Sequence, residues 1–322
     1  MGRLTLRISV VIPTYRRHDA LARTIEALER QTVGAGAFEV IVVDDPVDDD
    51  SRAVADALAV RERALRIRHV QREERGVSAA RNTGWRAAQA PLVMFLGDDI
   101  LASPRLLAEH LEWHARRGGE RIGVLGHVRW ASEIKTTAFM RWLERGYQFN
   151  YPAIRGEEAT WGDFYTANIS LPRESLEEVG GFDEERFPFL YEDLDLGYRL
   201  SQRGFRLFYN RCADAEHLHP TTMDDWRKRM SAIATVERRW VSHRREMPAY
   251  FHDTLLHAAG LPRARGVTAA LLRWIGPDTP LIGRHVWRRA DLYYRQRLAP
   301  AFLEQWNREE PVTRDAFGSA EA

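Results

Sequence analysis

The sequence predicts an α/β protein with a doubly wound, mostly parallel β-sheet and a helical C-terminal region. Short β-branched apolar runs alternate with helical periodicity over the first hundred residues, an order typical of parallel sheets with right-handed crossovers. Polar side chains directly follow several of these runs, and beyond residue 220 the pattern becomes helical and rich in arginine and tryptophan. We therefore expect an α/β domain over residues 1–220 and a helical, basic, tryptophan-rich extension over residues 221–322.

Four strands and three helices are expected before residue 97. The strands are apolar runs rich in β-branched residues, at residues 8–12, 38–43, 65–70 and 91–96. The helices cover residues 20–31, 51–60 and 77–89. In the first of them Leu21, Ile25 and Leu28 recur at the spacing of one helix face. A helix in each connection implies that the four strands pair in parallel.

Composition places the chain among globular proteins. Of its 322 residues, 44% are hydrophobic and 29% are charged, which is neither a disordered nor a membrane-spanning composition. The apolar segment at residues 8–12 ends at Pro13 and is too short for a signal peptide or a transmembrane helix. The single cysteine, Cys212, fits a reducing cytosol. We therefore expect a cytoplasmic protein, and the net charge of +1 gives no reason to expect nucleic acid as a partner.

Polar groups follow three of the predicted strands, at residues 14–16, 44–45 and 98–99. In an open α/β sheet the carboxyl ends of the strands meet at one edge, where ligands bind. The adjacent carboxylates of Asp98 and Asp99 repel each other unless they share a cation or hydrogen-bond donors. Alone, this pair also fits an acidic turn, but three converging strand ends favour a divalent cation that holds phosphate oxygens. Because Gly-x-Gly-x-x-Gly and P-loop patterns are absent, side chains and the cation would hold a nucleotide.

Seven motifs occur in an order that resembles family 2 glycosyltransferases. They are SVVIPTY (9–15), VVDD (42–45), GVSAARNTG (76–84), FLGDD (95–99), GGFD (180–183), YEDLDLGYRL (191–200) and HLHP (217–220). The resemblance covers roughly residues 8–220. It implies the GT-A fold, a nucleotide-sugar donor, Mn²⁺ or Mg²⁺ as cofactor and inversion at the anomeric carbon. The chain departs from the family at Gly97, where an acid is common, and at Pro46, where glycine is usual.

The resemblance also implies roles for the residues at the strand ends. Asp99 and His217 would hold the cation, and Asp98 would contact the ribose or a water on the cation. Asp45 would accept a hydrogen bond from the base, which favours uracil but also suits guanine. Other contacts to the nucleotide sugar are expected from Pro13, Thr14, Tyr15, Arg16 and Arg81. Arg81 could equally be a surface helix residue.

Glu192 and Asp193 precede a predicted helix, and acids there have a structural explanation because they complement the helix dipole. The resemblance implies instead that Asp193 is the general base for the acceptor hydroxyl, with Glu192 orienting the acceptor. One base without a covalent nucleophile is typical of direct inverting displacement. Trp161 and Asn168 are the candidate acceptor contacts, through ring stacking and amide hydrogen bonds.

His217 and His219 lie two residues apart in an extended segment, so only one of them is expected to face the site. The resemblance favours His217 as a ligand of the cation, and a core or helix-entry histidine is the alternative. His110 and His114 share a helix face at a spacing that can bind zinc. The charged residues between them favour a solvated face instead.

The C-terminal region is strongly basic. Residues 224–298 contain 15 lysines and arginines against seven acidic residues, with several tryptophans and tyrosines among them. Basic amphipathic helices with aromatic residues suit an anionic membrane surface. The alternative is a helical appendage that packs its aromatic face on the α/β domain or on a second subunit. We therefore expect either a peripheral contact at the inner face of the membrane or a homo-oligomer through these helices.

Three functions remain open at this level. The first is an inverting, metal-dependent glycosyltransferase that moves a sugar from a nucleotide diphosphate sugar, with UDP favoured, to a hydroxyl of a glycan or lipid-linked acceptor, as in polysaccharide biosynthesis of the cell envelope. The second is a sugar nucleotidyltransferase, which would need a glycine-rich triphosphate loop that residues 13–15 do not supply. The third is a non-catalytic protein that binds a nucleotide sugar or glycan. Asp99, Asp193 and His217 together argue against it.

Overall fold

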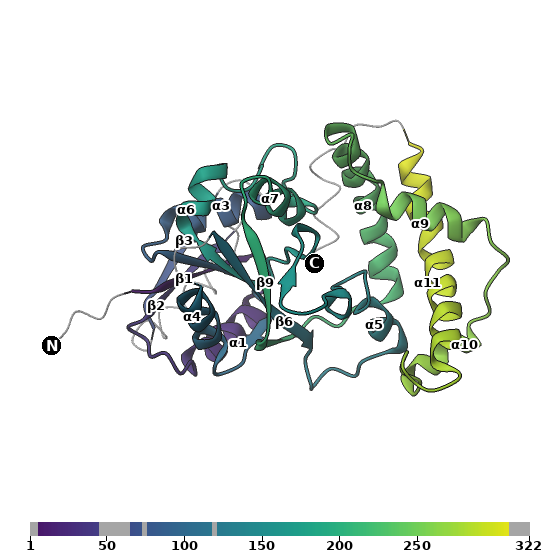
Figure 1. The fold of residues 1–322 in the computed structure, drawn as a ribbon, viewed down its shortest axis with the longest axis horizontal. Coiled ribbons are helices and arrows are strands. Elements are labelled where there is room, and N and C mark those ends of the chain that lie inside the picture. The colour runs from purple at the N-terminus through teal and green to yellow at the C-terminus, as the bar shows by residue number, and fades with distance from the viewer. Residues whose placement is uncertain (1–5, 45–64, 73–75, 118–120, 309–322) are drawn as a thin grey trace. The chain divides into compact units, whose positions relative to one another are not determined.

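The computed structural model describes residues 6–44, 65–72, 76–117 and 121–308 (Figure 1). The strands and helices predicted within these ranges are confirmed to within two residues at each end. The predicted helix at residues 51–60 and the candidate base contact Asp45 lie outside the described residues.

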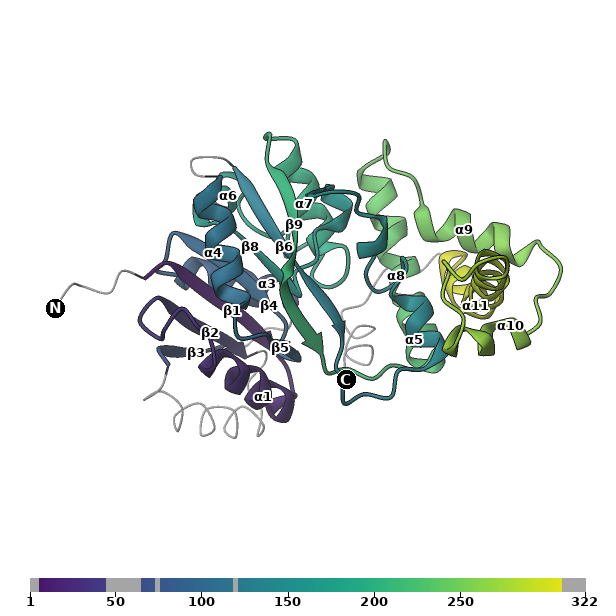
Figure 2. The same cartoon turned by 60° about the horizontal axis from the view of Figure 1, so that its bottom comes forward.

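The first unit of the chain contains a nine-stranded sheet in the order β3-β2-β1-β4-β8-β6-β9-β5, with β7 paired to β9 (Figure 2). Its strands are β1 (Ile8–Thr14), β2 (Phe38–Asp44), β3 (Ile67–Gln71), β4 (Leu92–Leu96), β5 (Ile100–Ala102), β6 (Ile122–Trp130), β7 (Glu158–Ala159), β8 (Asn168–Pro172) and β9 (Arg206–His217). The strands β3, β2, β1 and β4 pair in parallel, as predicted. The sheet as a whole is mixed, because β8 runs antiparallel to both β4 and β6.

The order of the parallel strands defines where a ligand can bind. The chain moves from β1 to β2 and β3 on one side and then returns to pair β4 with the other side of β1. The carboxyl ends of β1 and β4 therefore form the point at which the strand order reverses, and open α/β sheets bind ligands at such points. Thr14 ends β1, and Asp98 and Asp99 follow β4.

Helices in the first unit hold these strands in place. They are α1 (His18–Glu29), α3 (Val77–Ala87), α4 (Leu106–Arg116), α6 (Arg173–Val179) and α7 (Glu192–Ser201), with the 3-10 turns η1 (Tyr151–Ala153) and η2 (Trp161–Asp163). The helix α3 packs against β1 and β2. Gly84 permits this approach, because a Cβ atom there would lie 2.2 Å from the side chain of Val11.

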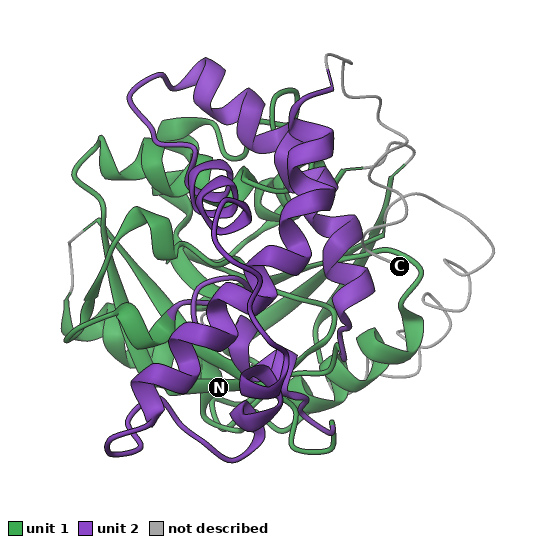
Figure 3. Cartoon of the chain, turned by 90° about the vertical axis from the view of Figure 1, so that its right-hand side faces the viewer, with its two compact units in different colours: residues 1–134, 151–219 green, residues 135–150, 220–322 purple. Residues whose placement is uncertain are grey.

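The second unit is helical and joins residues 135–150 to residues 220–322 (Figure 3). Its helices are α5 (Ala138–Leu143), α8 (Met223–His243), α9 (Tyr250–Ala259), α10 (Val267–Ala270) and α11 (Gly283–Trp306), with η3 (Leu271–Arg273) after α10. The rings that pack at its centre are those of Phe139, Trp142, Tyr147, Trp226, Phe251 and Tyr294. In addition, the indole N–H of Trp142 donates to Asp291, at 3.0 Å. The membership of residues 135–150 was not predicted, and the expected domain boundary at residue 220 stays a prediction.

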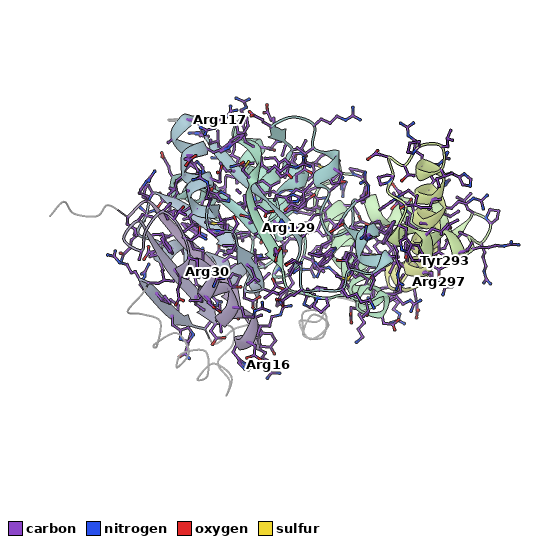
Figure 4. All side chains as sticks on the ribbon, turned by 90° about the horizontal axis from the view of Figure 1, so that it is seen from below. Arg16, Arg30, Arg117, Arg129, Tyr293 and Arg297 are labelled. Atoms are coloured by element: carbon purple, nitrogen blue, oxygen red, sulfur yellow. The ribbon has the colours of Figure 1, made fainter. Side chains whose placement is uncertain are left out.

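The aromatic residues of the basic helices mostly face inward. Trp226 and Trp240 of α8 and Tyr294 of α11 are buried, whereas Trp287 and Tyr293 of α11 are half-buried. The expected membrane contact of these helices stays a prediction. Arginines cover some of the remaining rings, as where Arg297 lies over Tyr293 with 4.7 Å to the ring centroid (Figure 4). Across the described ranges, each helix is too short or too polar to cross a bilayer.

Candidate functional site

Asp98 is fixed at the end of β4 by hydroxyl groups from two other elements. Thr14, the last residue of β1, donates to Oδ2 of Asp98 at 2.9 Å. Thr24 of α1 donates to the backbone carbonyl of the same residue at 2.7 Å. Asp98 and both threonines are buried. The predicted convergence of the ends of β1 and β4 is therefore present in the structure as direct contacts.

Asp99 faces the end of β9. The backbone N–H of Leu218 donates to the carbonyl of Asp99 at 2.9 Å, and His217 Nε2 lies 3.1 Å from Asp99 Oδ2. The indole ring of Trp130 stacks on His217 with 5.3 Å between the ring centroids. The two residues expected to hold the cation are thus adjacent, although their role as ligands stays a prediction.

Arg17, which the sequence did not single out, joins this group. Its Nη1 atom lies 3.1 Å from Asp98 Oδ1 and 3.0 Å from Asp99 Oδ2, and its Nη2 atom lies 2.6 Å from His219 Nδ1. Because a guanidinium only donates hydrogen bonds, Nδ1 of His219 must be the acceptor. We name Arg17, Asp98, Asp99, His217 and His219 the carboxylate–histidine cluster.

The expectation that only one of the two histidines faces the site is wrong. The strand β9 ends at His217, so the alternation of side chains does not extend to His219. The two imidazole rings lie 5.9 Å apart at an interplanar angle of 24°, and both reach the cluster.

The cluster shifts the pKa values of its two carboxyl groups in opposite directions. Burial, with the neighbouring charge of Asp99, raises the pKa of Asp98 to about 7 against the opposing effect of Arg17. Burial alone would also raise the pKa of Asp99, but His217 and the Arg17 guanidinium outweigh it and hold that pKa well below its usual range. The surroundings thus favour the charged form of Asp99 and disfavour that of Asp98.

The donor set fits a divalent cation. Two carboxylates and an imidazole nitrogen are oxygen and nitrogen ligands of the kind that Mg²⁺ and Mn²⁺ accept. The two carboxylates already pair with one positive charge, that of Arg17. Within the described ranges, no three His, Cys, Asp or Glu side chains are arranged to hold a metal by themselves. Such cations are commonly held by one or two carboxylates together with substrate phosphates, so a complete protein cage is not required.

The acids at the start of α7 follow a strained turn. Leu190 and Tyr191 have φ angles of 58° and 60°, a left-handed conformation that costs on the order of 1–3 kcal/mol per residue and is concentrated at functional sites. Asp193 is half-buried, and the backbone N–H of Leu194 donates to its Oδ1 atom at 2.8 Å. Glu192 is buried and pairs with Arg81 at 2.7 Å.

Arg81 therefore has a partner that neither sequence interpretation anticipated. It is not a surface helix residue, because its side chain is mostly buried against Glu192 and its guanidinium lies 5.6 Å from the centre of the Phe182 ring. The predicted contact of Arg81 with a diphosphate stays a prediction. Arg16 is exposed at the edge of the first unit, beside the ring of Tyr15 (Figure 4).

The predicted acceptor contact of Asn168 needs correction. Asn168 is fully buried, and its amide donates to the carbonyls of His127 and Ala213 at 3.2 and 2.9 Å. Its polar groups are thus used inside the protein, which excludes the predicted sugar contact in this structure. Trp161 is half-buried, with its ring edge-on to Tyr198, and its acceptor role stays a prediction.

His110 and His114 do not lie on a solvated face. His110 is fully buried, with Nε2 2.9 Å from Asn168 Oδ1 and Nδ1 2.8 Å from Ser170 Oγ, and His114 Nε2 is 2.9 Å from the same hydroxyl. Burial lowers the pKa of His110 to about 4 and that of His114 to about 3. Both histidines are therefore neutral and belong to a hydrogen-bonded chain behind β8.

The family of the chain follows from comparison with known proteins. A family model described as "Glycosyl transferase family 2" matches residues 9–180, and one described as "Glycosyl transferase family group 2" matches residues 99–277. Validoxylamine A glucosyltransferase of Streptomyces hygroscopicus subsp. limoneus is 34% identical over an alignment of 229 residues, which covers 63% of this chain and 50% of that protein. Pre-mycofactocin glycosyltransferase of Mycobacterium tuberculosis (strain ATCC 25618 / H37Rv) is 30% identical over 230 residues, 68% of this chain and 44% of that protein. The chain thus spans about half the length of these curated relatives.

Solved structures identify the fold. The mannosyltransferase PcManGT from Pyrobaculum calidifontis, in complex with GDP-Man and Mn²⁺, superposes with a TM-score of 0.62 at 19% identity, over 95% of this chain and 88% of that one. Residues 1–349 of S. aureus TarS in complex with UDP give a TM-score of 0.52 at 14% identity, over 94% and 90%. These neighbours have the GT-A fold, which confirms the predicted fold class. The chain belongs to family 2 of the glycosyl transferases.

Proposed function

We propose that the chain is an inverting glycosyltransferase that moves a sugar from a nucleotide diphosphate sugar to a hydroxyl of a glycan or lipid-linked acceptor. The observation that carries this proposal is the convergence of Asp98, Asp99 and His217 where the strand order of the sheet reverses. Asp98 and Asp99 already pair with a cation, the guanidinium of Arg17. Membership in a glycosyltransferase family supports sugar transfer over the two alternatives, a sugar nucleotidyltransferase and a non-catalytic protein that binds a nucleotide sugar or glycan.

Mn²⁺ or Mg²⁺ is the proposed cofactor, with Asp99 and His217 as its ligands. When bound, the cation would stabilise the negative charge that develops on the leaving diphosphate. Asp98 would contact the ribose or a water on the cation, and its bond from Thr14 fixes the orientation of its carboxyl group. Pro13, Thr14 and Tyr15, at the end of β1, would flank the base.

Asp193 is the proposed general base. As the acceptor oxygen bonds to the anomeric carbon from the face opposite the diphosphate, the bond to the diphosphate breaks and the hydroxyl proton passes to the Asp193 carboxylate. Glu192 is held by Arg81 at 2.7 Å and would orient the acceptor. The strained residues Leu190 and Tyr191 support a functional placement of these two acids.

UDP is the proposed nucleotide of the donor. One neighbouring structure contains UDP and another contains GDP-Man, so the base has to be determined by experiment. A thermal-shift screen of UDP-, GDP- and dTDP-sugars, with and without Mn²⁺, tests the donor. At a ligand concentration of about 100 Kd, binding stabilises a protein by about 2.7 kcal/mol, which raises Tm by about 5–10 °C in a domain of this size.

We expect this shift with a UDP-sugar and Mn²⁺ together, and its loss in Asp99→Asn. Asp19→Asn, which removes an exposed acid on α1, is the matched control and should keep the shift. A larger shift with GDP-sugars would overturn the choice of UDP. The absence of a shift with every donor in the unaltered protein would overturn the donor site itself.

A further inference from the structure

Exposed apolar side chains are concentrated in one part of the second unit. Within the described ranges, the large apolar side chains that are exposed all fall between residues 250 and 282: Tyr250, Leu256, Leu261, Val267, Trp274, Leu281 and Ile282. Three of them belong to the loop of residues 274–282, which joins η3 to α11 near α10 in Figure 1. Trp274 is 76% exposed, Leu281 is fully exposed and Ile282 is 48% exposed.

Hydrogen bonds connect the loop to itself and to α11. The N–H of Thr279 donates to the carbonyl of Gly276 at 3.2 Å, and the N–H of Gly283 donates to the carbonyl of Thr279 at 2.9 Å. The indole N–H of Trp287 on α11 donates to the carbonyl of Ile275 at 2.9 Å. Trp274, Leu281 and Ile282 are therefore presented on a hydrogen-bonded turn.

Leu281 combines two features that folding does not explain. Its φ angle is 65°, a left-handed conformation that is unfavourable for a leucine and is normally taken by glycine or asparagine. Its side chain is also fully exposed, so the conformation is not offset by burial in the core. Strain of this kind is concentrated at functional sites, so Leu281 is a candidate for contact with a partner outside the fold.

The charges around the loop indicate what it contacts. Arg273 precedes the loop, and Arg284 and Arg288 follow it one helical turn apart; all three are exposed. Between residues 261 and 289 there are six arginines and one acidic residue, Asp278. Basic residues near an anionic membrane contribute favourable binding energy, and tryptophan prefers the interface between lipid and water.

We propose that residues 273–288 form a membrane-docking face that places Trp274, Leu281 and Ile282 in the headgroup region of an anionic bilayer. The arginines Arg273, Arg284 and Arg288 contact the lipid phosphates. This face lies within the basic region of residues 224–298 for which the sequence suggested membrane contact, and the loop supplies its apolar contact. The proposal is independent of the donor, the cation and the general base.

Co-sedimentation with vesicles tests the proposal. We expect the full chain to bind vesicles of phosphatidylcholine mixed with phosphatidylglycerol, to bind phosphatidylcholine alone much less, and to dissociate at high salt. Replacing Arg273, Arg284 and Arg288 together by glutamine should weaken binding on the order of a hundredfold, because each basic residue contributes about fivefold. Brominated lipids should quench tryptophan fluorescence, and Trp274→Phe should remove most of that quenching.

Leu281→Asn separates binding from folding. Asparagine tolerates the left-handed conformation better than leucine does, so Tm should stay the same or rise, while vesicle binding falls by about tenfold through loss of the apolar contact. Leu256→Asn, which alters an exposed leucine on α9, is the matched control and should bind as the unaltered chain does. Equal binding by Leu281→Asn and the unaltered chain, or no preference for anionic vesicles, would overturn the proposal. So would a dimer that Leu281→Asn dissociates, since the loop would then bind a second copy.

Discussion

Arg17 pairs with both carboxylates of the proposed cation site, and its removal should therefore strengthen Mn²⁺ binding. The guanidinium contacts both carboxylates and His219 in the carboxylate–histidine cluster. A cation bound among the same oxygens has to displace it first. Arg17→Ala removes this competition. Arg17→Lys keeps the positive charge, but an ammonium group lacks the planar guanidinium that donates to three partners at once.

The size of the effect follows from the contacts. A hydrogen bond to a charged group contributes about 1.5–3 kcal/mol. Because 26% of the Arg17 side chain is exposed, solvent weakens its contacts. We therefore assign the three hydrogen bonds together the free energy of one. The apparent affinity for a ligand is reduced by the fraction of molecules that can bind it, so the dissociation constant for Mn²⁺ should fall on the order of ten- to a hundredfold in Arg17→Ala.

Isothermal titration with Mn²⁺, without nucleotide, measures this change directly. Arg23→Ala is the matched control, because Arg23 lies on α1, which begins directly after Arg17, but pairs with Glu133 on the surface. It should leave the dissociation constant unchanged. Arg17→Ala should also lower the Tm of the metal-free protein, because two buried carboxylates lose a shared partner, and Mn²⁺ should restore it. Unchanged or weaker Mn²⁺ binding by Arg17→Ala would refute displacement and show that the guanidinium assists the cation or lies elsewhere in solution.

Three further predictions concern the base, the pH dependence of stability and the packing behind β8. Asp193→Asn should lower kcat by about 10²–10⁴-fold, the usual contribution of a general base, while thermal shifts with donor and Mn²⁺ persist; full activity would exclude Asp193 as the base. His110 has a pKa lowered by burial from 6.5 to about 4, so the folded state binds fewer protons than the unfolded state between these values. Its contribution to stability is complete above pH 6.5 and is lost as the pH falls toward 4, by about 3 kcal/mol for a shift of this size. Urea unfolding from pH 7.5 to 4 should show this slope and His110→Gln should reduce it; equal slopes in both proteins would contradict the assignment. Gly126→Ala should destabilise the fold by about 1–3 kcal/mol through overpacking, because its Cβ atom would lie 2.2 Å from Asn168 Nδ2. Gly162→Ala, with only one contact at 3.5 Å, is the control, and equal melting temperatures for the two variants would disprove the packing argument.

Local patterns were enough to predict the parallel strands and the meeting of their polar ends. An apolar run that stops at Asp98 and Asp99 identifies a strand end whatever the rest of the chain does, and the spacing of the helices sets the parallel order. His217 next to Asp99 was reached through the family resemblance. Their contact depends on the antiparallel pairing of β5 with β9, which no local pattern contains.

The predictions that the structure contradicts concern residues whose contacts come from distant segments of the chain. The sequence alone does not show which of the adjacent arginines Arg16 and Arg17 faces the site. In the structure Arg16 has a left-handed conformation, with a φ angle of 53°, and Arg17, the next residue, joins the cluster. Asn168 is buried because Gly126, on a neighbouring strand, leaves room for its amide. The charged residues beside His110 and His114 gave no sign that this face of α4 packs against the sheet. Each of these facts follows from tertiary packing.

The second unit is assembled from two separate pieces of sequence, and this affects how relatives of the chain can be recombined. A chain cut at residue 220 would retain α5 but lose α8, α9 and α11, leaving Phe139, Trp142 and Tyr147 without the rings they pack against. Uncovered aromatic clusters of this kind promote aggregation. A chimera that exchanges the C-terminal helices between family members should therefore fold only if residues 135–150 are exchanged with them, so the two pieces are expected to change together during divergence.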